Sequence, residues 1–256
     1  MKNMTASSKL FIAAILTAGS MALASGLMQW QSKDLVRFLS FLVVAAIASR
    51  LRLKLPGTTG NMSVNLPFIL IALAQLSFSE TAVIAAASAF VQGLPALGKR
   101  VKPVQIAFNV STLVLAVTAA QLVCGRAASI PSMAAKSLLT ALAGAAFLIA
   151  DTLPIAGVIS LTENLKVWKV WREMLELTFA YFVLSAGVAA IVATATAYVG
   201  WVTPLVVLPV MIGTYASYRR YFRVSTVAAI TNLQFATLPA GAREKAQASQ
   251  EMKPTL

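Results

Sequence analysis

Apolar residues dominate eight stretches of the chain between Leu10 and Tyr218, and short polar connections separate these stretches. The stretches run from Leu10 to Trp30, Leu35 to Ser49, Leu66 to Phe78, Thr81 to Leu97, Val104 to Cys124, Ser137 to Leu161, Leu175 to Tyr198 and Trp201 to Tyr218. A helix of roughly 20 apolar residues crosses the hydrocarbon core of a bilayer. The pattern therefore predicts an all-α fold, a polytopic transmembrane helical bundle with six to eight crossings.

Two neighbouring stretches are unusual for membrane crossings. The stretch Leu66 to Phe78 has 13 residues, about 20 Å as a helix, against a hydrocarbon core of roughly 30 Å. Only Ser79 and Glu80 separate it from the next stretch, so we expect either a tight hairpin or a re-entrant piece. The polar, glycine-containing segment Pro56 to Pro67 forms either a cytoplasmic loop or part of a protein-lined cavity.

The first stretch has two interpretations. Lys2 and Lys9 precede it, and the small residues at positions 22–24 resemble a signal-peptide cleavage site. However, the apolar run continues to Trp30, and small residues at four-residue spacing form a face suited to helix packing. These small residues are Ala18, Ala22 and Gly26. We favour a retained helix over a cleaved peptide.

Composition agrees with a membrane protein. The chain is 59% apolar and 11% charged, whereas soluble domains carry about 25% charged residues. The polar residues are too few to cover a core in water, and this excludes a soluble globular protein. The lipid bilayer is therefore the first partner that the sequence predicts.

The basic residues alternate between the two sides of the predicted membrane. Of the 21 basic residues, 17 fall at the termini and in every second connection. These are Lys2, Lys9, Arg50, Arg52, Lys54, Lys99, Arg100, Lys102, Lys166, Lys169, Arg172, Arg219, Arg220, Arg223, Arg243, Lys245 and Lys253. Cytoplasmic connections carry the excess of Lys and Arg in membrane proteins. Both termini are therefore predicted to be cytoplasmic.

The net charge of +13 does not indicate a nucleic-acid partner. The basic residues form small clusters between apolar stretches, which is typical of charges that orient a membrane protein and attract anionic lipid. The chain has no histidine and one cysteine, Cys124. It also contains no phosphate-binding loop, HExxH or CxxC motif. The sequence therefore predicts neither an enzyme nor a metal site nor a cofactor.

Asp151 is the sharpest candidate for a functional residue. It lies near the middle of the stretch Ser137 to Leu161, where an ionised carboxylate costs a few kcal/mol. Pro154 cannot donate a hydrogen bond to the carbonyl of Ala150, and Gly144 shares the same helix face. An acid beside a free carbonyl is suited to a cation or a ligand amine. The alternative is a protonated acid that bonds to a neighbouring helix.

Other polar residues fall at a similar predicted depth, in the cytoplasmic half of the membrane. With Asp151 they come from four segments, and they are Asn65, Gln92 and Asn109. We expect the four side chains to line one ligand-binding pocket, whereas each alone is typical of a contact between helices. Candidates for an entrance on the outer side are Gln75, Glu80 and Gln121. Of these, Glu80 is expected to be a solvated turn residue.

The order of several segments resembles a known bacterial module. The segments are RLRLKLPGTTGNMSVNLPFILIALAQLSFSETAVIAAASAFVQ, KRVKPVQIAFNVSTLVLA, IADTLPIAGVISLTENLKVWKVWRE and YRRYFR. They resemble the multi-helix membrane-embedded sensor (MASE-like) that precedes HD-GYP phosphodiesterase and diguanylate cyclase domains. The resemblance covers Leu35 to Arg223, and its most specific pieces are LPGTTGNMSVN, Phe108 with Asn109, and Trp171 to Glu173. It implies a sensor in the bacterial cytoplasmic (inner) membrane that binds a small ligand or lipid.

The chain departs from that family after Arg223. The family has a signalling domain there, whereas 33 residues without histidine or a GGDEF-like stretch follow in this chain. We therefore expect an integral membrane domain over residues 1–223 and a short, disordered cytoplasmic tail over residues 224–256. We also expect any signal to pass to a separate partner protein.

A second resemblance gives an alternative function. The segment SVNLPFILIALAQLSFSETAVIAAASAFVQ resembles the substrate-binding S component of energy-coupling-factor vitamin transporters. Such components bind a small molecule inside a helical bundle and dock on a coupling subunit through small-residue faces. Small residues that suit this docking are Ala186, Ala190, Ala193 and Ala197. The resemblance implies a solute-binding membrane component of a transporter.

Overall fold

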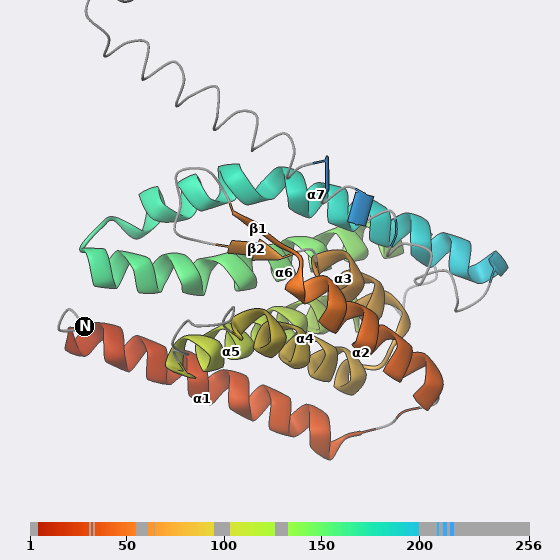
Figure 1. Cartoon of the computed structure of the whole chain (residues 1–256), viewed down its shortest axis with the longest axis horizontal. Coiled ribbons are helices and arrows are strands. Elements are labelled where there is room, and N and C mark those ends of the chain that lie inside the picture. The colour runs from red at the N-terminus through yellow and green to blue at the C-terminus, as the bar shows by residue number, and fades with distance from the viewer. Residues whose placement is uncertain are drawn as a thin grey trace, which may run out of the picture.

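Helices make up nearly all of the structure, a computed structural model that describes residues 5–30, 32, 34–54, 61–63, 65–94, 103–125 and 133–199 and five positions between 209 and 217. The helices are α1 (Ala6–Met28), α2 (Leu35–Arg50), α3 (Leu66–Gln75), α4 (Phe78–Gly93), α5 (Pro103–Cys124), α6 (Met133–Glu163) and α7 (Val167–Val199). A short antiparallel hairpin of β1 (Arg52–Lys54) and β2 (Asn61–Ser63) follows α2. Figure 1 shows α1 and α7 on opposite sides of the bundle, with the other helices between them. The all-α prediction is confirmed.

Three helices among the described residues are long and apolar enough to cross a membrane. They are Ala6–Met28, Pro103–Cys124 and the part Leu139–Glu163 of α6. The bent pair Val167–Glu176 and Thr178–Val192 adds a fourth when it is counted as one span. A multi-pass helical membrane protein is therefore confirmed. The higher number of crossings and the cytoplasmic termini stay predictions, and the stretch 201–218 and the tail 224–256 lie almost entirely outside the described residues.

The two closely spaced stretches form the short helices α3 and α4, which meet at a capped turn. The Ser77 side chain accepts a hydrogen bond from the Glu80 backbone N–H, and the Glu80 carboxylate accepts one from the Ser77 backbone N–H at 2.9 Å. This reciprocal capping box satisfies two free donors at the start of α4. The Ser32 hydroxyl also donates to Glu80, at 2.7 Å. The prediction of a solvated Glu80 is wrong, because its side chain is 4% exposed and fully engaged in this turn.

Helix α1 packs against the bundle through a face with a seven-residue period. Its buried residues Ile12, Gly19 and Gly26 follow one another every seven residues, and Ser8 lies one turn before Ile12. A methyl group added at Gly19 would overlap the backbone and side chain of Ser111 on α5, so the two helices approach closely there. The predicted packing face was wrong in part, because Ala18 is exposed and only Gly26 of its three residues is buried. The seven-residue repeat, rather than the four-residue one, faces the neighbouring helices.

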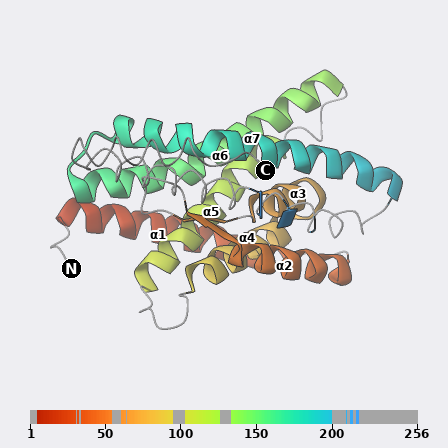
Figure 2. The same ribbon diagram turned by 45° about the horizontal axis from the view of Figure 1, so that its top comes forward.

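Helix α3 occupies the interior of the bundle, whereas α2 has one exposed apolar face. Phe68, Ile69 and Ile71 of α3 are completely buried, and Figure 2 shows α3 nearly end-on between α7 and α2. The exposed face of α2 contains Val36, Leu39, Val43 and Ile47 at helical spacing. Large exposed apolar faces are rare on soluble monomers. The α2 face therefore agrees with contact to lipid.

Candidate functional site

Asp151 lies in the middle of α6, on the side of that helix that packs against α7. Helical spacing places it on one face with Gly144 and Phe147. Gly144 and Phe147 both lie against Phe182 of α7. The rings of Phe147 and Phe182 stack, with their centroids 6.4 Å apart. The Asp151 side chain is half-buried. It makes no hydrogen bond or ion pair with any residue in the described part of the chain. Within this part of the chain, nothing occupies its carboxylate, which suits it to a ligand or a proton.

Helix α1 gives a common scale for the depths of Asp151 and Asn109. It runs antiparallel to α6, because Ser8 donates a hydrogen bond to the Leu161 carbonyl and Phe11 contacts Gly157. Thr17 is six residues after Phe11 along α1, and Asp151 is six residues before Gly157 along α6. Thr17 is therefore level with Asp151.

The contact between α1 and α5 extends this scale to Asn109. Gly19 contacts Ser111, so Thr17 is also level with Asn109, two residues before Ser111. Asp151 and Asn109 therefore lie close to one level of the bundle.

Gln92 joins this level from α4. The glycine that follows it, Gly93, packs against Ile106 of α5, and a Cβ atom added there would lie 2.6 Å from the Ile106 side chain. Ile106 is three residues before Asn109, which is less than one helical turn. Gln92 and Asn109 are both half-buried, and the contact brings their helices together at this end of the bundle.

Asn65 lies at the start of α3, and it is buried. The neighbouring Leu66 backbone is within hydrogen-bonding reach of Tyr181 on α7. The residue after Tyr181, Phe182, stacks on Phe147, one turn from Asp151. The structure thus places Asn65 beside the stretch of α7 that packs on the Asp151 face. That all four side chains line one pocket stays a prediction.

Two hydroxyl groups that the sequence analysis missed extend this set. Ser88 of α4 and Thr112 of α5 are 0% and 1% exposed, and their side-chain oxygens have no hydrogen-bond partner among the described residues. Ser88 is one turn before Gln92, and Thr112 is three residues after Asn109, so each shares a helix side with a predicted site residue. This spacing to Gln92 and Asn109 was the signal in the sequence that could have identified the two hydroxyl groups. We call Gln92, Asn109, Asp151, Ser88 and Thr112 the polar layer.

The unpartnered state of these hydroxyls is unusual within this bundle. The hydroxyls of Thr118 on α5 and Thr152 on α6 donate to carbonyls one turn earlier in their own helices, at 2.8 and 2.7 Å. Such back-bonding is the usual way for Ser and Thr to satisfy a hydroxyl inside a helix. Ser88 and Thr112 do not use it, so their hydroxyls stay available to a polar group from elsewhere.

Two of the three residues predicted to form an entrance, Gln75 and Glu80, make contacts that stabilise the fold. Gln75 accepts a hydrogen bond from the Arg37 guanidinium at 2.7 Å, and the Ser79 hydroxyl donates to the Gln29 carbonyl. With the Ser32–Glu80 bond, these contacts tie the connection between α1 and α2 to the turn between α3 and α4. Gln121 is half-buried on α5. The prediction of an entrance at this end has no support in these contacts.

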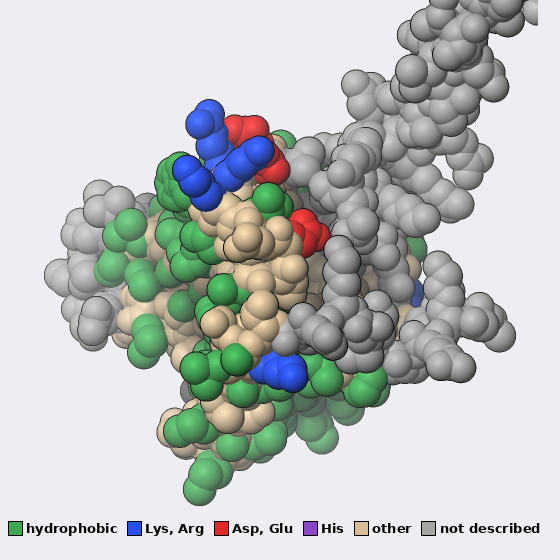
Figure 3. All heavy atoms as spheres, turned by 90° about the vertical axis from the view of Figure 1, so that its left-hand side faces the viewer, with side chains coloured by type: hydrophobic (Ala, Val, Ile, Leu, Met, Phe, Trp, Pro, Cys, Tyr) green, Lys and Arg blue, Asp and Glu red, His purple; other side chains and the backbone are tan. Residues whose placement is uncertain are grey.

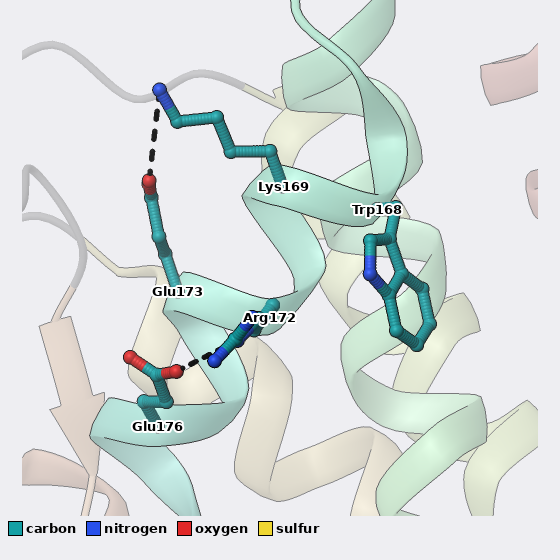
Figure 4. A pocket seen from close by; sticks show the side chains of 5 residues that line it. All are labelled: Trp168, Lys169, Arg172, Glu173 and Glu176. Atoms are coloured by element: carbon teal, nitrogen blue, oxygen red, sulfur yellow. Dashed lines mark hydrogen bonds and ion pairs between the residues drawn. The ribbon is translucent and has the colours of Figure 1, made fainter.

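An open hollow lies on the surface of the first part of α7. Trp168, Lys169, Arg172, Glu173 and Glu176 line it, all from the first turns of α7 (Figure 4). Its charges pair along the helix, Lys169 with Glu173 at 4.0 Å and Arg172 with Glu176 at 3.0 Å. Within the described residues, no three acidic, cysteine or histidine side chains come together in a way that would hold a metal ion.

Comparison with known proteins gives no family for this chain. No protein-family model, curated protein or solved structure matches it. The resemblances to MASE-like sensors and to transporter S components therefore stay predictions. What is shown is a helical protein with several apolar helices of membrane-spanning length.

Proposed function

We propose that this chain is an integral membrane sensor that binds a small polar ligand in the polar layer and relays its occupancy to a partner protein. The observation that carries the proposal is the pair of buried hydroxyls on α4 and α5, Ser88 and Thr112, which have no hydrogen-bond partner among the described residues. Half-buried Gln92, Asn109 and Asp151 accompany them. A ligand that bonds to these groups would supply their missing hydrogen-bond partners and so stabilise the bundle.

Energetics support a binding role over a purely structural one. A buried hydroxyl without a partner costs about 1–3 kcal/mol, and Ser88 and Thr112 both fall in this class among the described residues. A valine or alanine at either position would avoid that cost. Their retention beside Gln92 and Asn109 agrees with selection for contacts to a bound molecule.

The charges of the layer favour a ligand with a positive charge or an amine. Asp151 supplies a carboxylate, and Gln92 and Asn109 supply amide oxygens, all acceptors for an ammonium group. The described basic residues lie outside α4, α5 and the central part of α6. An anionic ligand would therefore meet the Asp151 carboxylate without a compensating charge in these helices.

The contacts of α7 offer a route for the relay. The face of α6 that contains Asp151 packs on Phe182, and the Trp171 indole N–H donates to the Thr152 hydroxyl next to Asp151, at 3.0 Å. In this proposal, α7 is the helix that passes a change at Asp151 to the partner, because these contacts join it to the Asp151 face. This supports a sensor over a protein that only stores a ligand.

Native mass spectrometry of the full chain, released from lipid nanodiscs, tests the proposal. We expect a small-molecule adduct on the wild type and on Glu163→Gln, which removes an exposed acid at the end of the same helix. Asp151→Asn should lose the adduct while its unfolding midpoint stays within the range of the control. Absence of any adduct from the wild type, or equal occupancy on Asp151→Asn, would contradict the proposal.

A further inference from the structure

The first part of α7 runs along α6 from the turn between the two helices to the middle of α6. Near the turn, the Ser160 hydroxyl donates to the Leu165 carbonyl at 2.7 Å. Six residues further along the chain, the Trp171 indole N–H donates to the Thr152 hydroxyl at 3.0 Å. Between these contacts the level changes by eight residues of α6, roughly 12 Å. The first part of α7 therefore extends inward, antiparallel to α6.

The contact with Thr152 lies deep in the apolar part of the bundle. Thr152 follows Asp151, the central residue of the candidate span Leu139–Glu163. The residues of α6 between Asp151 and Glu163 carry no charge, and neither do residues 10–17 of the neighbouring α1. Thr152 is roughly 16 Å from the end of the candidate span at 1.5 Å per residue. This is about half of a hydrocarbon core of roughly 30 Å.

Two acids of α7, Glu173 and Glu176, lie near the middle of this span. They follow the residue that bonds to Thr152, and they precede Phe182, whose ring stacks on Phe147 of α6. Their level is therefore between those of Thr152 and Phe147. Because an ionised side chain in the hydrocarbon core is costly, the surroundings of these acids need an explanation.

The two acids belong to exposed ion pairs. Lys169 pairs with Glu173 and Arg172 pairs with Glu176, and each of the four side chains is more than three-fifths exposed. Figure 4 shows both pairs on one side of α7, where with Trp168 they line a hollow of about 370 Å³. A water molecule occupies roughly 30 Å³ in the liquid. The hollow is therefore large enough for several water molecules beside the charges.

The exposed residues of α7 become apolar after Glu176. Those that are more than half exposed in the second part of the helix are Phe179, Val183 and Ile191. The change coincides with a bend, because the axis of Val167–Glu176 is inclined by 51° to that of Thr178–Val192. Charged residues within membrane proteins face the bundle interior or a water-filled cavity, whereas exposed apolar residues suit lipid. The change along one helix therefore indicates water on the first part and lipid on the second.

The charged side of α7 is open toward the end of the bundle where α6 turns into α7. Figure 3, which faces that end, shows basic and acidic side chains grouped at one edge. The first helix begins at the same end, because Ser8 of α1 bonds to the Leu161 carbonyl near the end of α6. The sequence predicts this end to be cytoplasmic.

We propose that the charged side of Val167–Glu176 lines a water-filled vestibule that opens at the α6–α7 turn and reaches the level of Asp151. Water in the vestibule solvates the two ion pairs, which would otherwise face hydrocarbon. As the route of a polar ligand to the polar layer, the vestibule rests on the function proposed above, whereas its water does not. Water is detectable there whether or not a ligand binds, so failure of one proposal is distinguishable from failure of the other.

Nitroxide labels on single cysteines of the full chain in bilayers test for this water. In a Cys124→Ser background, the labelled vestibule positions are Lys169, Arg172, Glu173 and Glu176. Matched controls at the same depth are Ile149 and Leu153, which are 47% and 44% exposed. They lie two residues before and after Asp151, and therefore on the other side of α6. Relaxation by a water-soluble nickel chelate reports water, and relaxation by oxygen reports lipid. Only labelled proteins that keep the wild-type unfolding midpoint are compared.

We expect the nickel chelate to relax the labels at all four vestibule positions, and oxygen alone to relax those at Ile149 and Leu153. Labels at Glu173 and Glu176 that only oxygen reaches would overturn the proposal, because lipid would then face the ion pairs. Labels there that neither reagent reaches would also overturn it, because protein would cover them. Equal nickel relaxation at Leu153 and Glu173 would place this whole level outside the membrane, and that result too would refute the vestibule.

The position of the opening is tested with a membrane-impermeant thiol reagent on sealed vesicles. Thiolates are the reactive form of cysteine, and they form in water and not in hydrocarbon. Glu173→Cys should react from the same side of the membrane as Glu163→Cys, an exposed position at the end of α6. Leu153→Cys should react from neither side. Reaction of Glu173→Cys only from the side opposite to Glu163→Cys would contradict an opening at the α6–α7 turn.

Discussion

Replacement of Gly19 by alanine tests how α1 is held in the bundle. The added methyl group would overlap the Cβ, Cα and Oγ atoms of Ser111. Since one of these atoms belongs to the backbone of α5, a side-chain rotation cannot relieve the overlap, and α1 must move outward. Overpacking of this kind costs about 1–3 kcal/mol.

Alanine also favours a helix over glycine by about 1 kcal/mol, so the net expected loss is about 0–2 kcal/mol, and the loss relative to a control that gains the same propensity is about 1–3 kcal/mol. The matched control is Gly187→Ala on α7, because a Cβ atom there meets nothing within 4 Å. This control should be neutral or gain up to about 1 kcal/mol from helix propensity. Gly26→Ala should fall between them, since its methyl group would lie 3.2 Å from the movable Phe78 ring.

Reversible unfolding of the purified variants in mixed detergent and denaturing surfactant gives the three free energies. If Gly19→Ala proves as stable as Gly187→Ala, the close contact between α1 and α5 does not exist in the mature protein. The same result would follow if the first helix were a cleaved signal peptide, whereas a loss of stability in Gly19→Ala would show that this helix is retained.

Three further perturbations address the turn, the polar layer and the topology. Glu80→Ala should lower the free energy of unfolding by about 1–2 kcal/mol in the same assay, because it removes a helix cap. Its control, Glu173→Ala, breaks an exposed ion pair and should change that free energy by less than about 1 kcal/mol. Equal effects would contradict the buried role of Glu80. Thr112→Val should lose the ligand adduct without loss of stability, whereas Thr118→Val, which removes a partnered hydroxyl, should keep it; equal adducts on both would count against the polar layer. A single cysteine beside Lys99 should resist an impermeant thiol reagent added outside intact cells, and labelling there would reverse the predicted topology.

Hydropathy predicted the helices well where the chain has long apolar runs, and less well where polar chemistry sets a boundary. The start of α3 at Leu66 matches the predicted stretch, because Pro67 suits the first turn of a helix. The end of α3 at Gln75 precedes the predicted end at Phe78. The run of apolar residues continues past Gln75, but the Ser77 cap starts a new helix, and a hydropathy average does not detect a cap.

The candidate site was predicted in part for a related reason. Asp151 stands out in the sequence because an acid inside an apolar run is costly. Ser88 and Thr112 do not stand out, because most hydroxyls in helices bond to their own backbone, as Thr118 does. Their importance depends on burial without a partner, and this is visible only once the neighbouring helices are in place.

The most direct test of the polar layer is ligand-induced thermal stabilisation of the wild type and Asp151→Asn, with the small molecule that the native mass spectrum identifies. At about 100 times its dissociation constant, a ligand stabilises the folded state by about 2.7 kcal/mol. The asparagine side chain keeps hydrogen-bonding capacity and nearly the same volume, so the variant should fold with the wild-type midpoint in the absence of ligand. We predict a shift for the wild type and none for Asp151→Asn at the same concentration. An equal shift for both proteins would contradict a binding role for Asp151.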